Sequence, residues 1–119
     1  MKEYDLKERT KGFALQVIQL VERLPRRRAA DIMGGQLLRA GTSVGANYRA
    51  ACRAKSSADF ISKMGIVEEE ADESIYWMEL LIEAGIVKST DLESLMREAN
   101  ELLAIAVSSI KTARRNKSK

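Results

Sequence analysis

Five polar residues in the middle of the chain have the types and spacing of an ionic network between two helices. Arg39, Ser43 and Asn47 follow one another at four-residue steps, which puts them on one helix face, and Glu70 and Glu73 share a face of a later helix. An unpaired buried polar group costs about 1–3 kcal/mol, so we expect Arg39 to bridge to Glu70 or Glu73. Such a network either fixes helix register and assembly or forms a ligand site, and the structural role is favoured.

The acidic run around these glutamates, residues 68–73, raises the question of a carboxylate metal site. Di-metal sites in helical bundles combine glutamates with histidines on facing helices, and this chain has no histidine. The same absence excludes Ser/His/Asp and Cys/His catalytic sets. The pair Gly34 and Gly35 lies within an expected helix rather than after a strand, so it does not form a phosphate loop. We therefore predict no catalytic, metal or cofactor site, and a protein that is not an enzyme.

Lysines and arginines form the second group of candidate site residues, and the chemistry they suit is phosphate binding. The candidate nucleic-acid contacts are Arg26, Arg27, Arg28, Arg49, Arg53 and Lys55, extended at the C-terminal end by Lys111, Arg114, Arg115, Lys117 and Lys119. The net charge is only +3, yet residues 1–55 and 111–119 are basic and residues 56–110 are acidic. Aromatic residues that stack on bases are scarce here, with only Tyr48 nearby. Two interpretations stay open: a surface that binds RNA or DNA through its phosphates, and a surface that only keeps the protein soluble.

Long helices must position these residues, and the apolar periodicity predicts four of them. The expected helices span residues 6–24, 29–54, 57–84 and 91–111. Pro25 ends the first, Ser56 caps the third, Gly85 takes a left-handed conformation after it, and Thr90 caps the fourth. Short links make consecutive helices antiparallel, so we predict an all-α, up-down-up-down four-helix bundle. Residues 1–111 would form this domain and residues 112–119 a basic, disordered tail.

The stretch 36–51 is loaded with glycine, alanine and serine, and Gly34 and Gly35 precede it. Each glycine inside a helix costs about 1 kcal/mol relative to alanine. We expect a close approach of another backbone to offset that cost. Cys52, the only cysteine, follows these small residues, and we interpret it as a packed thiol in a reducing compartment.

The third helix carries two apolar stripes. One is a heptad pattern from Phe60 to Leu81, which predicts the contact with its own bundle. The other runs through Ile66, Trp77 and Leu80, and we expect it to face a second subunit. A helix with two such stripes often serves two neighbours.

Residues of the second and third helices carry a family resemblance. They are Gln36, Leu37, Arg39, Ala40, Ser43, Val44, Ala46, Asn47 and Ala51, followed by Asp59, Phe60, Lys63, Ile66, Glu70, Ala71, Glu73, Tyr76, Trp77, Leu80 and Leu81. At these positions the chain resembles the 23S ribosomal RNA intervening-sequence proteins, and also the accessory protein of diversity-generating retroelements. The resemblance implies an antiparallel four-helix bundle that assembles as a ring-shaped homopentamer. For the accessory protein it implies a basic pentamer that binds nucleic acid and a reverse transcriptase, but most members have no established activity.

Two hypotheses for function follow from these patterns. The first is a non-enzymatic oligomeric scaffold that binds nucleic acid through a basic surface without strong sequence specificity. The second is a protein-interaction scaffold, with an acidic or disordered protein as partner and no nucleic-acid role. No apolar run approaches the roughly 20 residues of a membrane span, and the charged first residues do not resemble a signal peptide. We therefore expect a cytoplasmic protein without a membrane partner.

Overall fold

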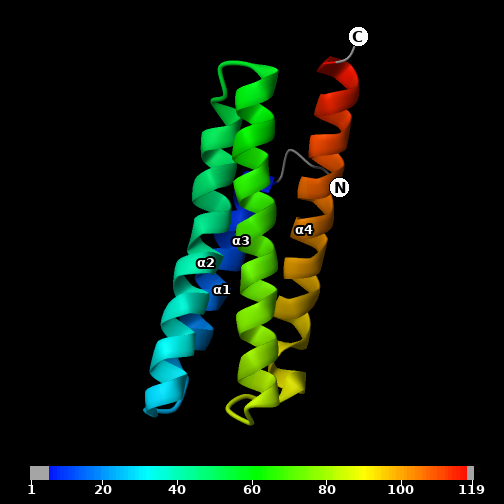
Figure 1. Ribbon diagram of the computed structural model, residues 1–119. Helices are drawn as coiled ribbons and strands as arrows, with labels where there is room; N and C mark the ends of the chain where they lie inside the picture. Colours follow the sequence, from blue (N-terminus) through cyan, green and yellow to red (C-terminus); the bar gives the residue numbers. More distant parts are fainter. Residues whose placement is uncertain (1–5, 118–119) are drawn as a thin grey trace.

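The computed structural model describes residues 6–117, and these residues form four helices and no strand. Their bounds are α1 Leu6–Glu22, α2 Arg28–Cys52, α3 Ser57–Glu83 and α4 Ser89–Lys117. Successive helices run in opposite directions along one long axis, with the α1–α2 and α3–α4 links at one end and the α2–α3 link at the other (Figure 1). The all-α, up-down-up-down arrangement that the sequence predicts is confirmed.

Capping interactions explain where α3 begins and ends. The Ser56 hydroxyl accepts the Asp59 backbone N–H at 3.0 Å, and the Asp59 carboxylate accepts the Lys55 N–H at 3.2 Å. At the other end Gly85 has a φ of 74°, and the Ile86 N–H donates to the Leu81 carbonyl at 3.0 Å. Both α3 caps were therefore predicted correctly, since each depends on a short local pattern.

The prediction that Thr90 caps α4 was wrong. The helix begins at Ser89, and the Asp91 N–H already donates to the Lys88 carbonyl at 3.0 Å. Thr90 therefore lies inside the first turn rather than before it. The chain re-enters the helical conformation directly after the short turn that follows Gly85.

The disordered tail expected for residues 112–119 is also corrected, because α4 continues to Lys117. No glycine or proline interrupts residues 111–117, and alanine, arginine and lysine are good helix formers. Cationic side chains near the C-terminal end of a helix are further stabilised by its dipole. Ser118 and Lys119, the remaining tail residues, lie outside the described part of the chain.

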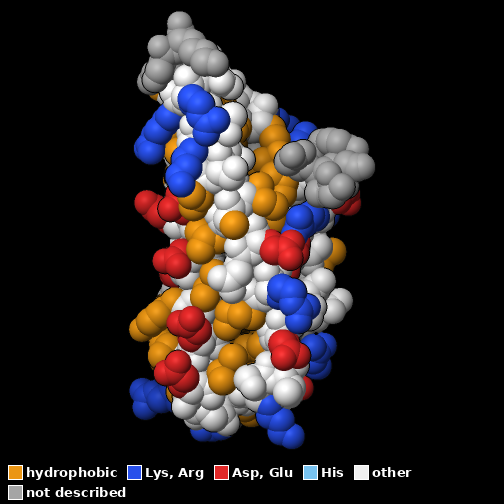
Figure 2. All heavy atoms as spheres, turned by 90° about the vertical axis from the view of Figure 1, so that its right-hand side faces the viewer, with side chains coloured by type: hydrophobic (Ala, Val, Ile, Leu, Met, Phe, Trp, Pro, Cys, Tyr) orange, Lys and Arg blue, Asp and Glu red, His pale blue; other side chains and the backbone are white. Residues whose placement is uncertain are grey.

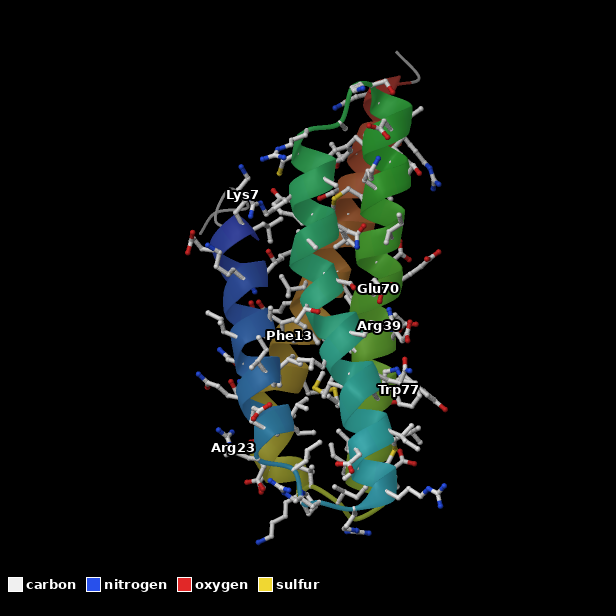
Figure 3. The ribbon with its side chains drawn as sticks, turned by 90° about the vertical axis from the view of Figure 1, so that its left-hand side faces the viewer. Lys7, Phe13, Arg23, Arg39, Glu70 and Trp77 are labelled. Carbon is white, nitrogen blue, oxygen red and sulfur yellow. The ribbon has the colours of Figure 1, made fainter. Side chains whose placement is uncertain are left out.

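The core lies between α2 and α3, which contact each other most, with α1 packed on α2 and α4 packed on α3. The boundary between α1 and α4 has far fewer contacts. The largest fully buried side chains come from all four helices: Phe13, Val17, Leu37, Val44, Met64, Met78, Leu81 and Leu92. Figure 3 shows Phe13 on the side of α1 that faces the other helices. Burial of these side chains, each contributing about 1.5–3 kcal/mol, holds the four helices together.

Glycines of α2 allow the close approach of α1, as the sequence predicts. A Cβ atom at Gly41 would lie 2.9 Å from a Val17 methyl group, and one at Gly45 would lie 3.1 Å from the Thr10 hydroxyl oxygen and 3.4 Å from its backbone carbon. Gly35 differs, because a Cβ atom added there would have no atom within 4 Å apart from its chain neighbours and the nearby backbone of α2. The small residues of α2 therefore set the distance between α1 and α2.

Candidate nucleic-acid interface

An ionic cluster joins α2 to α3. Arg39 donates through Nη1 to Glu70 Oε1 at 3.2 Å and through Nη2 to Glu73 Oε2. The Trp77 indole N–H donates to the same Glu73 oxygen at 3.2 Å. Figure 3 shows Arg39 beside Glu70, and Trp77 further along the contact between α2 and α3. This is the pairing expected from the sequence, and its role in assembly stays a prediction.

The cluster lies at the surface rather than in the core, which corrects the expectation of a buried network. The Arg39 side chain is 47% exposed. Ser43 and Asn47 do not reach α3: the Ser43 hydroxyl donates to the Arg39 carbonyl at 2.7 Å, and the Asn47 amide donates to the Ser43 carbonyl at 2.8 Å. The physical reason is that the buried stripe of α2 runs through residues 37, 40 and 44, which turns the Arg39 face toward the edge of the α2–α3 contact.

Replacing Arg39 with alanine is expected to raise the pKa of Glu73. In the wild-type protein the Arg39 guanidinium, assisted by the Trp77 N–H, holds the pKa of this carboxyl below its ordinary value. A depressed carboxyl pKa contributes stability that is present above the ordinary pKa and is lost as the pH falls through the lower folded value. The Arg39→Ala variant should therefore lose less stability than wild type across that acidic interval.

Carbon-13 NMR of the Glu73 carboxyl measures this pKa directly, and urea titrations at several acidic pH values measure the accompanying change in stability. Lys63→Ala is the control, because Lys63 pairs with Asp59 at 2.9 Å instead. An unchanged Glu73 pKa in Arg39→Ala would show that the ion pair does not persist in solution. The mass of the Arg39→Ala protein tests separately whether the cluster supports assembly.

The predicted basic residues do not form one surface. Arg26, Arg27 and Arg28 lie where α1 connects to α2, whereas Arg53 and Lys55 lie where α2 connects to α3. The 25 residues of α2 separate the two groups by about 37 Å at about 1.5 Å per residue. We call these regions the α1–α2 end and the α2–α3 end of the bundle.

The two ends differ in their acidic content. At the α1–α2 end the arginines and Lys88 are interleaved with carboxylates, which are Glu22, Asp31, Glu83 and Asp91. At the α2–α3 end the cations come from every helix and are Lys7, Lys11, Arg49, Arg53, Lys55, Lys63, Lys111, Arg114 and Arg115. The described carboxylates at the same level are Glu8, Asp59, Glu98 and Glu101. Asp59 pairs with Lys63, and Glu98 and Glu101 pair with Arg9, which lies between Lys7 and Lys11. Figure 2 shows basic side chains at the upper end of the α4 side and acidic ones along its middle. The α2–α3 end is therefore the more strongly basic one.

Two lysines at that end, Lys7 and Lys11, were missed as candidate site residues. They lie one turn apart on α1, beside Arg49 of α2. The signal available in the sequence was their four-residue spacing on a helix whose apolar stripe lies elsewhere. The sequence does not reveal the register of α1 along α2, and this register brings Lys7 and Lys11 close to Arg49.

The stripe expected to face another subunit is partly covered within one chain. Ile66, Trp77 and Leu80 are each half-buried, and Trp77 packs against the hydrophobic core. The Trp77 ring also makes an edge-to-face contact with the Tyr76 ring, with 5.1 Å between the two ring centroids. The Tyr76 residue is 52% exposed. Because α3 packs on both α2 and α4, its two apolar stripes do not by themselves require a second subunit. The subunit-interface role stays a prediction.

Cys52 is exposed, so its interpretation as a packed thiol was wrong. It follows the buried Ala51, and one residue along a helix turns a side chain by about 100°, away from the buried stripe. Burial, assisted by Cys52, raises the pKa of the neighbouring Tyr48 to about 12.

Among the described residues no group of acidic or cysteine side chains is arranged to hold a metal ion. Within residues 6–117 no helix combines the length and apolar character needed to cross a membrane.

Comparisons with known proteins place the chain in a family. The family model for the 23S rRNA-intervening sequence protein matches residues 2–108. A crystal structure from Bacteroides thetaiotaomicron, described as a protein with unknown function from the S23 ribosomal protein family, is similar with a TM-score of 0.83 and 38% identity. The similarity covers 88% of this chain and 97% of that one. No curated protein matches the chain. The chain therefore belongs to the 23S rRNA-intervening sequence protein family.

Proposed function

We propose that the protein is a non-enzymatic, oligomeric helical scaffold that binds nucleic acid through the α2–α3 end of its bundle. The observation that supports this most is the gathering of cations from all four helices at one end, where they outnumber the carboxylates. Some of these cations are paired, since Arg9 contacts Glu98 and Glu101 and Lys63 contacts Asp59, but the cations at this end outnumber the carboxylates. A surface on which cations gather is the electrostatic footprint of a phosphate-binding protein.

The composition of this end favours contacts with the phosphate backbone over readout of bases. Arginine and lysine neutralise phosphates and release counterions, which provides affinity without sequence information. The aromatic side chains there are Tyr48 and Phe60, which are both half-buried, whereas single-strand binders use exposed rings on which bases stack. Binding that is tight at low salt and weakly sequence-specific is the expected behaviour.

Self-association is the second part of the proposal, with a ring-shaped homopentamer as the assembly. A closed ring repeats the same surface on every subunit, so the α2–α3 ends of all copies would lie on one side of the ring. A single nucleic acid could then contact several copies, which raises the overall affinity without new contacts. The half-buried Ile66 and Leu80 and the exposed Tyr76 support an interface on α3. The family resemblance supports the pentamer.

Removing three positive charges from the α2–α3 end is expected to weaken nucleic-acid binding much more than removing three from the other end. The test variant is Arg53→Ser, Lys55→Ser and Arg115→Ser. The control is Arg26→Ser, Arg27→Ser and Arg28→Ser, which has the same net charge. Fluorescence anisotropy with one RNA and one DNA oligonucleotide, repeated over a salt series, measures both. The slope of log K against log salt should fall by up to about 3 in the test variant and change little in the control.

Three results would count against the proposal. Equal losses in the two variants would mean that only the net charge matters, and affinity that stays flat over the salt series would exclude phosphate contacts. No binding by the wild-type protein would favour the alternative, a protein-interaction scaffold. A single protein partner recovered after nuclease treatment would then support that alternative.

A further inference from the structure

A hollow of about 190 Å³ lies between α1 and α2 near the α2–α3 end. Its lining consists of Lys7, Thr10, Lys11, Ala14, Thr42, Gly45, Ala46 and Arg49. Three of these described lining residues are cations, and none of them is a carboxylate. Figure 3 shows Lys7 near the upper end of α1, beside α2. The hollow is thus a small, positively charged recess between two helices.

Small residues of the two helices create this recess. Gly45 has no side chain, and α1 approaches it so closely that a Cβ atom would lie 3.1 Å from the Thr10 hydroxyl oxygen. Ala46 and Ala14 add only methyl groups to the lining. The longer side chains of Lys7, Lys11 and Arg49 lie around a shallow floor that nothing larger fills. The small residues therefore leave a shallow hollow between the helices, with the three cations around it.

The three cations have no ion-pair partner among the described residues. Their neighbour Arg9 shows the contrast, because it donates to Glu98 at 2.7 Å and to Glu101 at 2.8 Å on the α4 side of α1. Lys7 and Lys11 are one helical turn apart, a spacing at which like charges repel. An anion in the recess would reduce the repulsion between the two lysines and also the repulsion between the lysines and Arg49.

The shape and donors of the recess decide which anion fits. Both hydroxyl protons in its lining are already used, since Thr10 donates to the Leu6 carbonyl at 2.7 Å and Thr42 to the Leu38 carbonyl at 2.8 Å. The available donors are therefore the two ammonium groups and the guanidinium of Arg49. A guanidinium matches two oxygens of a phosphate at once, and an ammonium acts as a point charge beside it.

We propose that the recess formed by Lys7, Lys11 and Arg49 is a phosphate-binding site. Building on the proposed function, its ligand is a backbone phosphate of a nucleic acid that crosses the α2–α3 end. The site then fixes one phosphate between α1 and α2, and the cations at positions 53, 55 and 115, which lie further toward the α2–α3 end, contact other phosphates of the same nucleic acid. A free phosphate ion has the same chemistry and is the other source that the experiment must separate.

The test compares two double variants. The first carries Lys7→Gln and Arg49→Gln, and the second, the control, carries Arg27→Gln and Arg28→Gln. The two proteins have equal charge, and all four positions are exposed, so circular dichroism should show unchanged folding. Inorganic phosphate is titrated into ¹⁵N-labelled protein, and an oligonucleotide is titrated in parallel over a salt series. We expect saturable shifts of the Gly45 and Ala46 amides with phosphate in wild type and control, and their loss in the Lys7/Arg49 variant. The oligonucleotide salt slope should fall by about 2 in that variant only.

Each outcome separates this proposal from the broader one. Phosphate shifts that survive in the Lys7/Arg49 variant, or that occur equally elsewhere on the surface, would overturn the site. If the oligonucleotide binds wild type and both glutamine double variants equally but fails to bind the variant at positions 53, 55 and 115, the site is wrong and the proposed function stands. If the recess binds inorganic phosphate but wild type binds no oligonucleotide, the site stands, free phosphate is its ligand, and the nucleic-acid role is wrong.

Discussion

Replacing Gly41 with leucine is expected to lower the free energy of unfolding by about 3 kcal/mol, the upper end of the usual range for overpacked positions. Gly41 is buried against α1, and its Cβ position lies 2.9 and 3.0 Å from the two methyl groups of Val17 and 3.2 Å from the Val17 Cβ. A β-branched side chain on a helix has one strongly preferred rotamer, so Val17 cannot turn aside. The helices would have to separate, which breaks the contact between α1 and α2.

Gly35→Leu is the matched control, because it makes the same change on the same helix at an exposed position with no atom within 4 Å. Leucine has a higher helix propensity than glycine, so this variant should gain up to about 1 kcal/mol. Urea unfolding followed by circular dichroism, at one fixed protein concentration, measures both variants. Similar effects of the two substitutions would contradict the idea that α2 uses its glycines to admit α1.

Replacing Phe13 with alanine is expected to cost about 3–5 kcal/mol, the usual loss for a fully buried phenylalanine. Phe13 is 1% exposed and belongs to the hydrophobic core. Its removal leaves a cavity on the side of α1 that faces the bundle, and α1 has little contact with α4 to compensate. The melting temperature and the urea midpoint should both fall clearly.

Leu15→Ala provides the comparison on the same helix, since Leu15 is 53% exposed. This substitution should change stability by less than about 0.5 kcal/mol, as is usual at the surface. A larger loss in Leu15→Ala than in Phe13→Ala would mean that α1 is rotated about its axis from the position described. A large loss only at high protein concentration would instead place Leu15 in an interface between copies.

The fold was predictable because buried side chains on long helices must recur with the helical period. The heptad stripe of α3 shows this directly: Phe60, at its start, is partly buried, and the later members Met64, Val67, Ala71, Ser74, Met78 and Leu81 are all buried. The end of α4 was not predictable in the same way. Its apolar stripe stops at Ile110, but periodicity reports burial rather than helicity. A solvated continuation of six or seven residues therefore has no apolar signal to mark it.

The candidate site was predictable only where it depends on local spacing. Arg39 could be matched to Glu70 and Glu73 because α2 and α3 are joined by a short link and run antiparallel. The grouping of Lys7 and Lys11 with Arg49 depends instead on the register of α1 along α2, which the Gly45–Thr10 contact sets in three dimensions. The division of the basic residues between two ends follows once α2 is recognised as one unbroken helix.

The sparse boundary between α1 and α4 has a consequence for how the chain acquires its structure. Nearly all contacts between helices join helices that are consecutive in sequence. Helical proteins rich in such local contacts fold on the order of microseconds to milliseconds. Each new hairpin can therefore form as soon as its second helix leaves the ribosome. The last helix can dock mainly on α3, and its fewer contacts with α1, which include the ion pairs of Arg9 with Glu98 and Glu101, can form afterwards.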